Sequence, residues 1–313
     1  MNILVTGGLG HIGSKLIREL FEKKEISLIR ILDNLSTQRY SSLFNLPLNK
    51  KYEFIQGDIL NKEDVNKAMQ DIDIVIHLAA ITDAANSFKI KDLIEKVNVE
   101  GTKNIVESAL NHNVKKFFYP STTSVYGPIN GIATENCKDS DLKPQSPYAE
   151  TKLKGEKIVL NAFKEHGFNS TVCRLGTVSG TSIGMRFHTA VNKFVFQACY
   201  NQSLTVWDSA FQNKRPYLDL KDAIRAIFFS MDKKETSGKL FNVVNINASI
   251  QEVIDIIKEY IPNLKITITK SPLLNQMSYV VDDSKIKSLG FTYVGSLRES
   301  IKDTVKLLRP DLF

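Results

Sequence analysis

Short apolar runs alternate with longer amphipathic segments along the first 175 residues of the chain. Runs rich in apolar, β-branched or aromatic residues predict strands at residues 3–5, 28–32, 52–56, 74–78, 117–119 and 170–174. Between the first two, Ile12, Leu16 and Leu20 recur at helical spacing and so share one face. Strands that alternate with helices in this way are typical of parallel sheets. The pattern predicts an α/β fold with a doubly wound parallel (Rossmann) sheet.

The alternation becomes irregular after residue 175 and regular again near residue 220. The predicted elements in this part are a helix over residues 190–200, a strand over 204–207, a helix over 223–231 and a strand over 240–244. We therefore assign residues 1–175, and also about 218–246, to the sheet domain. Residues 176–217 and 247–313 are assigned to a smaller, C-terminal substrate-binding region.

The composition of the 313 residues, 42% hydrophobic and 24% charged, is that of an ordinary globular chain. The apolar runs fall short of the roughly 18 residues that a membrane-spanning helix needs. The first residues contain no basic stretch followed by a long apolar core, so we expect no secretory signal and a cytoplasmic protein. No membrane partner is predicted.

The net charge of +7 does not by itself indicate a nucleic-acid partner, because the Lys and Arg residues are spread along the chain. A solvated, lysine-rich surface explains the charge, and a small anionic substrate would also fit it. Cys137, Cys173 and Cys199 lie far apart and lack neighbours at metal-ligand spacing. We expect these cysteines to be reduced and structural, and we predict no metal site.

A glycine-rich turn follows the first predicted strand and opens the first predicted helix. It contains Gly7, Gly10 and Gly13, with His11 and Ile12 between the last two. In dinucleotide-binding folds such glycines permit a sharp turn, a close approach of the pyrophosphate and tight packing of helix on strand. The phosphate then lies at the positive end of the helix. A tight turn that binds nothing is the alternative interpretation of this motif alone.

Asp33 ends the second predicted strand, twenty residues after Gly13. A carboxylate at this point accepts hydrogen bonds from the adenosine ribose, and it repels the 2′-phosphate of NADP. The glycine-rich turn and Asp33 together predict NAD as the cofactor. The positive charge of Arg39 nearby would weaken the preference for NAD over NADP. Asn34 and Ser36, which follow Asp33, are predicted to contact the cofactor too.

Tyr148 and Lys152 form the second chemical motif, in a predicted helix that begins after residue 147. A spacing of four places both side chains on one helix face. A phenol has a pKa near ~10, so it acts as a base at neutral pH only beside positive charge. We expect Lys152 and the oxidised nicotinamide to supply that charge. Without a cofactor turn, the pair would be interpreted as an ordinary surface Tyr and Lys.

These motifs occur with several others in a fixed order. They are Gly57-Asp58-Ile59, His77-Leu78-Ala79-Ala80, Asn98 before Gly101-Thr102, and Ser121-Thr122-Thr123-Ser124-Val125-Tyr126-Gly127. Over essentially its full length the chain resembles the extended short-chain dehydrogenases/reductases, in particular the nucleotide-sugar epimerases and dehydratases.

The resemblance implies roles for residues outside the glycine turn. Asp58 and Ile59 would hold the adenine, Leu78, Ala79 and Ala80 would line the cofactor cleft, and Asn98 would be a further cofactor contact. Lys152 would also bind the nicotinamide ribose, and Thr122 would hydrogen-bond the reacting sugar hydroxyl. The helices around residues 88–112 and 147–165 would pair with a second copy, which implies a homodimer.

The implied reaction is oxidation of a nucleotide-diphospho-sugar at C4. Tyr148 would take the hydroxyl proton while the hydride passes to NAD. Dehydratases of the group place Asp and Glu after the catalytic Thr, whereas this chain has Thr123 and Ser124. Because neither is a suitable acid or base, a 4,6-dehydratase is disfavoured. A 4-epimerase acting through a transient 4-keto sugar is therefore predicted, with a C4 dehydrogenase as the alternative.

The substrate-binding region carries weaker signals. Arg215 resembles the arginine with which the family clamps the diphosphate, a task that suits a bidentate guanidinium. The chain departs from the family at Thr177, where an Asn is frequent, and at Pro272 and Asn275, where a second Arg and an Asp are frequent. The predicted substrate contacts are Thr122, Thr123, Thr177, Arg186, Asn192, Arg215 and Asn275. The stretch from Asn275 to Tyr279 is expected to supply neutral contacts.

A regulatory protein that senses NAD without catalysis is an alternative from another functional class, because some relatives keep the dinucleotide turn and lose the chemistry. The presence of Thr122, Tyr148 and Lys152 argues against it.

Overall fold

A computed structural model describes residues 1–47, 51–129, 131–208, 211–270 and 278–313. Its main element is a seven-stranded sheet. In chain order the strands are β1 (Asn2–Thr6), β2 (Leu28–Asp33), β3 (Lys51–Gln56), β4 (Ile74–His77), β5 (Lys116–Thr122), β7 (Ser170–Leu175) and β11 (Lys239–Val243). Their spatial order is β11-β7-β5-β4-β1-β2-β3, and every pair is parallel. The predicted doubly wound parallel sheet is confirmed.

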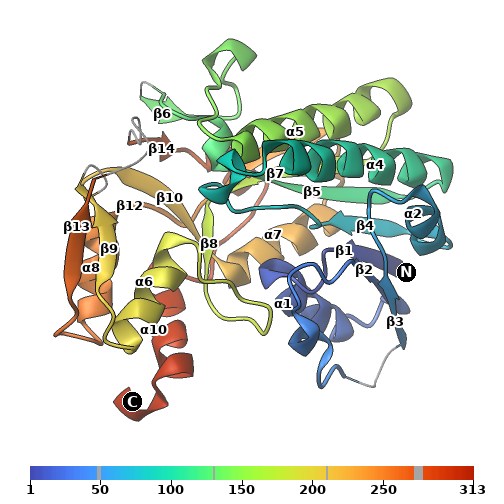
Figure 1. The fold of residues 1–313 in the computed structure, drawn as a ribbon. Helices are drawn as coiled ribbons and strands as arrows, with labels where there is room; N and C mark the ends of the chain where they lie inside the picture. The colour runs from blue at the N-terminus through green and yellow to red at the C-terminus, as the bar shows by residue number, and fades with distance from the viewer. Residues whose placement is uncertain (48–50, 130, 209–210, 271–277) are drawn as a thin grey trace.

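Helices cover both faces of this sheet (Figure 1). One face carries α2 (Lys62–Met69), α3 (Lys91–Glu95), α4 (Gly101–Asn111) and α5 (Pro147–His166). The other carries α1 (His11–Phe21), α7 (Leu220–Asp232) and α9 (Ser284–Ser288). In β1, Ile3 and Val5 pack toward the second face and Leu4 toward the first, and all three are buried. Burial on both faces explains why the strands are continuous apolar runs.

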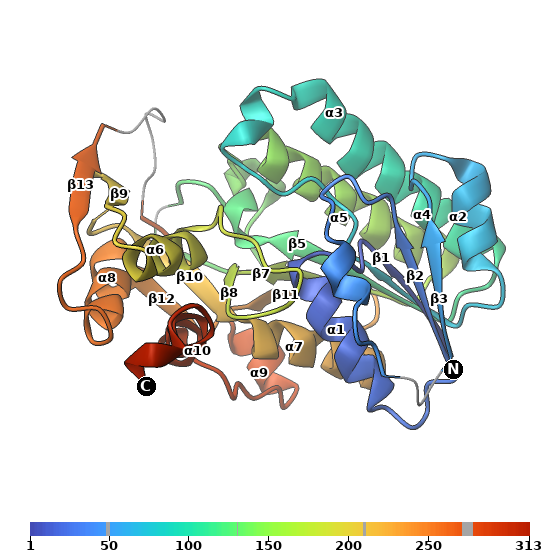
Figure 2. The same cartoon turned by 60° about the horizontal axis from the view of Figure 1, so that its bottom comes forward.

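The C-terminal lobe lies beside the carboxyl ends of the strands (Figure 2). Its small sheets comprise β8 (Thr177–Ser179), β10 (Lys214–Asp219) and β12 (Ile246–Ser249), then β9 (Leu204–Trp207) with β13 (Ile266–Thr269), and β6 (Ile132–Ala133) with β14 (Val280–Val281). The helices are α6 (Ala190–Cys199), α8 (Ile250–Lys258) and α10 (Leu297–Leu308). Their apolar faces share one core with β9 and β10.

The chain passes between the two parts more than once. After β10 has paired with β8 and β12 in the lobe, α7 and β11 return to the large sheet. The strand order of that sheet reverses between β1 and β4. In open α/β sheets, ligands bind at the carboxyl ends of the strands at such a point. The topology therefore positions a ligand site at the face that the lobe covers.

Candidate active site

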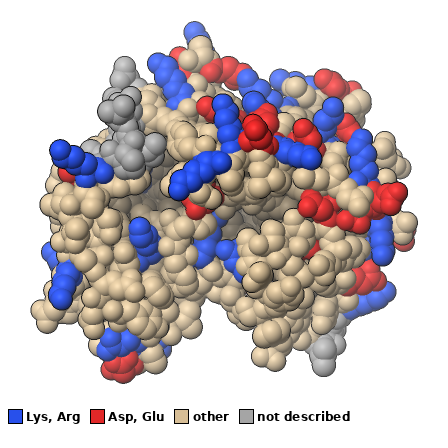
Figure 3. Space-filling model, viewed as in Figure 1, with Lys and Arg blue, Asp and Glu red and all other residues tan. Residues whose placement is uncertain are grey.

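A cavity of about 1040 Å³ lies between the carboxyl ends of the large sheet and the C-terminal lobe. In Figure 3 the surface is hollowed at this place, with basic side chains beside the opening. Ordinary small-molecule pockets have volumes of roughly 300–1000 Å³. The cavity is therefore large enough to hold a cofactor and a substrate together.

Most of the residues that the sequence nominated come together in the lining of this cavity, although they belong to segments far apart in the chain. Those residues are Gly7, Gly10, His11, Ile12, Gly13, Asp33, Asn34, Ser36, Asp58, Ile59, Leu78, Ala79, Ala80, Thr122, Tyr148, Lys152, Thr177, Arg186 and Arg215. Asn275 and Pro272 lie outside the described residues.

Asn98 was predicted to contact the cofactor, but the structure places it outside the cavity lining. It is buried, and its Oδ1 accepts a hydrogen bond from the Ile81 amide at 2.8 Å. Its Nδ2 donates to the Ile81 carbonyl and to Thr151 Oγ1, both at 3.0 Å. The amide is thus engaged by protein groups and holds the loop after β4, and its contact with the cofactor stays a prediction.

Asn192 and Thr123, predicted as substrate contacts, do not line the cavity either. The Asn192 side chain accepts from the Gly180 amide at 3.3 Å and donates to the Arg186 carbonyl at 3.0 Å. Thr123 Oγ1 lies 3.5 Å from the Tyr279 hydroxyl. Both side chains are buried and engaged by protein groups, so a direct substrate contact of these two residues stays a prediction.

The glycine turn has the shape that a dinucleotide requires. Gly7 has φ +65°, and a Cβ there would lie 2.6 Å from the Ala79 backbone. A Cβ on Gly13 would lie 2.6 Å from Gly8, so the helix could not pack this closely on the turn. Gly10 is the N-cap of α1 and has no side chain to cap it. The amide groups at this helix end are therefore suited to bind a pyrophosphate.

Asp33 closes the same end of the cavity at the last residue of β2. Its two carboxylate oxygens accept hydrogen bonds from the Leu9 amide at 3.2 Å and the Leu35 amide at 2.9 Å. These bonds orient the carboxylate beside the glycine turn. Asp33 and the glycines together fit the adenosine half of NAD.

The end of the cavity that holds Thr122, Tyr148 and Lys152, called the reacting end below, is formed where β5 and α5 meet. Thr122 is the last residue of β5, and Tyr148 and Lys152 lie in the first turns of α5. Ser146 begins this helix, because its side chain accepts from the Ala149 amide at 3.2 Å and Pro147 follows it. The cap thereby places the Tyr and the Lys on the helix face that lines the cavity.

Burial dominates the protonation of both side chains. The Lys152 amine lies 4.0 Å from the centroid of the Tyr119 ring, and burial lowers its pKa to about 7, against the opposing charge of Glu156. Burial raises the pKa of Tyr148, while the charge of Arg186 and a hydrogen bond with Thr122 lower it. The sequence predicted that Lys152 lowers the pKa of Tyr148. Arg186 supplies a further positive charge that acts on the phenol, and the expected contribution of Lys152 with the oxidised nicotinamide stays a prediction.

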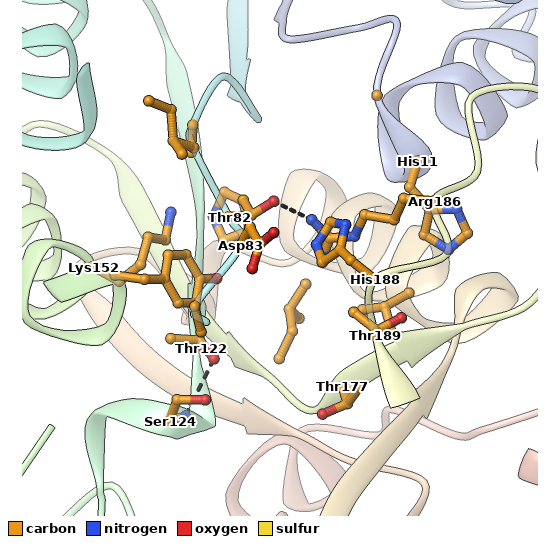
Figure 4. A pocket seen from close by; sticks show the side chains of 18 of the residues that line it. His11, Thr82, Asp83, Thr122, Ser124, Lys152, Thr177, Arg186, His188 and Thr189 are labelled. Atoms are coloured by element: carbon orange, nitrogen blue, oxygen red, sulfur yellow. Dashed lines mark hydrogen bonds between the residues drawn. The ribbon is translucent and has the colours of Figure 1, made fainter. Parts of the chain in front are cut away.

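Arg186 reaches across the cavity from the loop between β8 and α6. Its guanidinium donates to Thr82 Oγ1, and its Nε is buried without a hydrogen-bond partner among the described residues. Figure 4 shows Thr82 and Asp83 between Lys152 on one side and Arg186 with His188 on the other. The loop after β4 and the lobe therefore meet at the reacting end.

Several lining residues had no signal in the sequence. They are Thr82, Asp83, His188, Lys193 and Trp207, which lie on the loop after β4, around the start of α6 and on β9. None belongs to a motif, so only the place of each segment in the fold reveals them. Tyr279, from the stretch expected to supply neutral contacts, also lines the cavity, and the Arg215 guanidinium lies 4.8 Å from its ring centroid.

Comparison with known proteins agrees with this geometry. Residues 3–246 match the model of the NAD dependent epimerase/dehydratase family. The chain belongs to this family. It is therefore an NAD-dependent enzyme of the extended short-chain dehydrogenase/reductase type, and the predicted cofactor is confirmed.

Relatives of this family with different named activities are similar to the chain. The human dTDP-D-glucose 4,6-dehydratase is 31% identical, over 98% of this chain and 89% of that protein. The UDP-glucuronic acid 4-epimerase of Bacillus cereus, solved with UDP-glucuronic acid and NAD, is 28% identical with a TM-score of 0.90 and covers 99% of each chain. The UDP-glucose 4-epimerase of Thermotoga maritima is 25% identical with a TM-score of 0.89 over all of each chain.

Neither a membrane-spanning helix nor a cluster of metal ligands occurs among the described residues. Every helix among them is too short or too polar to cross a membrane. No group of three or more His, Cys, Asp or Glu side chains within the described ranges is arranged to hold a metal ion.

Proposed function

We propose that the enzyme is a nucleotide-diphospho-sugar 4-epimerase that acts through a transient 4-keto sugar. The observation that carries the proposal is the composition of the reacting end. Thr122, Tyr148 and Lys152 line the cavity together, whereas the two positions after Thr122 carry Thr123 and Ser124. Elimination of water across C5 and C6 needs an acid and a base there, and these hydroxyls have no suitable pKa.

Each side chain of the reacting end has its own role in the proposed epimerisation. Ionised Tyr148 takes the proton from the C4 hydroxyl and later returns it, and the Thr122 hydroxyl orients the C4 oxygen. Lys152 would hold the nicotinamide ribose of the cofactor, as the family resemblance implies. Arg215 and Arg186 attract the anionic groups of the substrate. NAD, when bound, would supply the hydride acceptor for C4 and the hydride donor for the opposite face of the sugar ketone.

A 4,6-dehydratase is the second candidate. It is supported by the similarity to the human dehydratase and by Asp83, a carboxylate that lines the cavity and acts electrostatically on Arg186 and His188. Asp83 follows β4 and not Thr122, so it differs in position from the acidic pair of the dehydratases. A C4 dehydrogenase would use the same residues as the epimerase and release NADH.

Product analysis distinguishes these functions. The purified enzyme is incubated with NAD and with UDP-glucose, UDP-glucuronic acid or dTDP-glucose, and the products are resolved by chromatography and NMR. We expect a C4 epimer without net NADH. A keto product lighter by one water would assign the dehydratase, and accumulating NADH would assign the dehydrogenase. Binding of NAD without turnover of any sugar nucleotide would favour the NAD-sensing regulator.

We also propose that the enzyme is a homodimer that pairs through the helices over residues 88–112 and 147–165. The proposal rests on the family resemblance and on the position of α4 and α5 on one outer face of the sheet domain (Figure 2). Light scattering of the purified protein tests it, and a monomeric mass would contradict it.

A further inference from the structure

A buried ion pair lies directly behind the reacting end of the cavity. Arg174 on β7 donates from Nε to Glu156 Oε1 at 2.9 Å and from Nη2 to Glu156 Oε2 at 2.7 Å. The Ser121 hydroxyl on β5 donates to the same carboxylate. Glu156 and Arg174 are only 2% and 3% exposed. The carboxylate therefore has a fixed position in a site that water does not reach.

The position of this carboxylate connects three elements to the proposed chemistry. Glu156 follows Lys152 by one helical turn, so the two side chains lie on neighbouring positions of the same face of α5. Ser121 immediately precedes Thr122. Glu156 thus joins the helix that carries Lys152 to the strand that carries Thr122, and Arg174 joins both to β7.

The buried amine of Lys152 needs a nearby negative charge to stay protonated. It is 4% exposed, and its amine lies over the ring of Tyr119. The titratable groups that interact with it are Glu156 from its own helix, His77 from β4 and Tyr119 from β5. Burial lowers the pKa of His77 to about 3, so His77 is neutral. Among the described residues, Glu156 is the anion that raises the pKa of Lys152.

A buried ion pair contributes little net stability compared with well-packed apolar side chains, so the pair is not explained by stability alone. We propose that Glu156 is a positioning residue: held by Arg174 and Ser121, its carboxylate keeps the Lys152 amine charged at the cofactor cavity and anchors α5 to β5. This inference rests on the proposed role of Lys152 in holding the cofactor.

The test is a titration of Lys152 that needs neither substrate nor turnover. The enzyme is labelled with ¹³C at the ε-carbon of lysine, and the Lys152 resonance is assigned by its loss in Lys152→Met. The chemical shift is then followed against pH in the wild type and in Glu156→Gln. We expect the midpoint to fall by about one pH unit, a tenfold rise in the acid dissociation constant of the amine. Glu156→Asp, which keeps the charge, should restore most of this difference.

Glu150→Gln is the matched control, because Glu150 is an exposed carboxylate on the same helix two residues before Lys152. It should leave the Lys152 midpoint unchanged. Glu156→Gln removes the anionic partner of Arg174. If circular dichroism shows that this variant is unfolded, the double variant Glu156→Gln/Arg174→Gln is compared with Arg174→Gln, which lacks the same arginine charge. An unchanged Lys152 midpoint in folded Glu156→Gln, or in the double variant relative to Arg174→Gln, would overturn the inference. Absent turnover in the wild type would instead overturn the proposed function.

Discussion

The side-chain amide of Asn98 donates to Thr151 Oγ1 at 3.0 Å and so links the first turns of α5 to the loop that lines the cofactor cavity. Asn98 lies in a short π-helical segment, Lys96–Glu100, between α3 and α4. Its carbonyl accepts from Thr102 Oγ1 at 2.7 Å, and Thr102 Oγ1 in turn lies 3.1 Å from His77 Nε2. A buried polar chain therefore runs from β4 to the helix of Tyr148 and Lys152.

We predict that Asn98→Ala lowers stability and weakens NAD binding. The substitution leaves the Ile81 amide and carbonyl without their buried partners, at a cost of about 1–3 kcal/mol. Because Ile81 belongs to the cavity lining, the cofactor dissociation constant should rise as well. Urea unfolding and calorimetric titration with NAD measure the two effects. Asn111→Ala, at an exposed position in α4, should change stability by less than about 0.5 kcal/mol.

We predict that the enzyme loses stability in mild acid through His77. The pKa of this histidine falls from 6.5 to about 3 on burial, so the folded state resists protonation while the unfolded state binds a proton below pH 6.5. Stability present above pH 6.5 is therefore lost as the pH falls toward 3. Between pH 7 and pH 5 the loss from this group is about 2 kcal/mol.

The comparison of His77→Gln with the wild type by urea unfolding at pH 7 and pH 5 checks this prediction. The variant should lose about 2 kcal/mol less over the interval, because it has no group to protonate. His166→Gln removes an exposed histidine and serves as the control. Equal losses in His77→Gln and the wild type would disprove the assignment.

Arg186 should control the pH at which the enzyme works. Its charge lowers the pKa of Tyr148, and the proton transfer requires the ionised phenol, so kcat rises with pH through the pKa of Tyr148. Arg186→Met should move this rising limb to higher pH, and Arg186→Lys should move it less because the charge remains. The measurement is kcat against pH. If KM rises while the rising part of the kcat curve stays at the same pH, the role of Arg186 is limited to substrate binding.

Tyr148→Phe should separate binding from chemistry. The phenyl ring fills the same space, so we expect the NAD dissociation constant to change by no more than about twofold. Loss of the general base should reduce turnover by roughly 10²–10⁴-fold. Calorimetry and product analysis test the two halves of the prediction. Full activity in this variant would remove Tyr148 from the mechanism.

Asp33→Ala should weaken NAD binding by about 10–100-fold, because charge-assisted hydrogen bonds to the ribose contribute about 1.5–3 kcal/mol. It should also relax the preference for NAD over NADP, since the repulsion of a 2′-phosphate is lost. Asp92→Ala, at an exposed position in α3, is the control. Titration with both cofactors measures the ratio of the NADP and NAD dissociation constants. An unchanged ratio would contradict the role of Asp33. A melting curve reports the loss of the contacts to Leu9 and Leu35.

Local chemistry explains which features the sequence could predict. The predicted strand over residues 204–207 coincides with β9, and the predicted helix over 190–200 differs from α6 by one residue. Periodicity is a property of neighbouring residues, and so are a glycine turn and a Tyr and Lys four residues apart. Their presence in one cavity follows from the parallel sheet, which brings the carboxyl ends of its strands to one edge.

The sequence could not determine the direction in which a polar side chain points. Asn98, Asn192 and Thr123 have residue types suited to ligand contacts, yet each is buried against other protein groups. Thr82, Asp83 and His188, in contrast, lie on the cavity without any motif. Which side of a loop faces a ligand depends on what packs against the other side, and that partner belongs to a distant segment.

The sequence by itself determined the doubly wound sheet, the NAD turn with Asp33 and the pair of Tyr148 and Lys152, because each depends on residues close together in the chain. Only the tertiary structure decided which charges act on that pair. Arg186 acts on the phenol from the lobe, while Arg174 and Ser121 hold Glu156 behind Lys152. Coulombic interactions and burial depend on distances through space, and folding sets those distances.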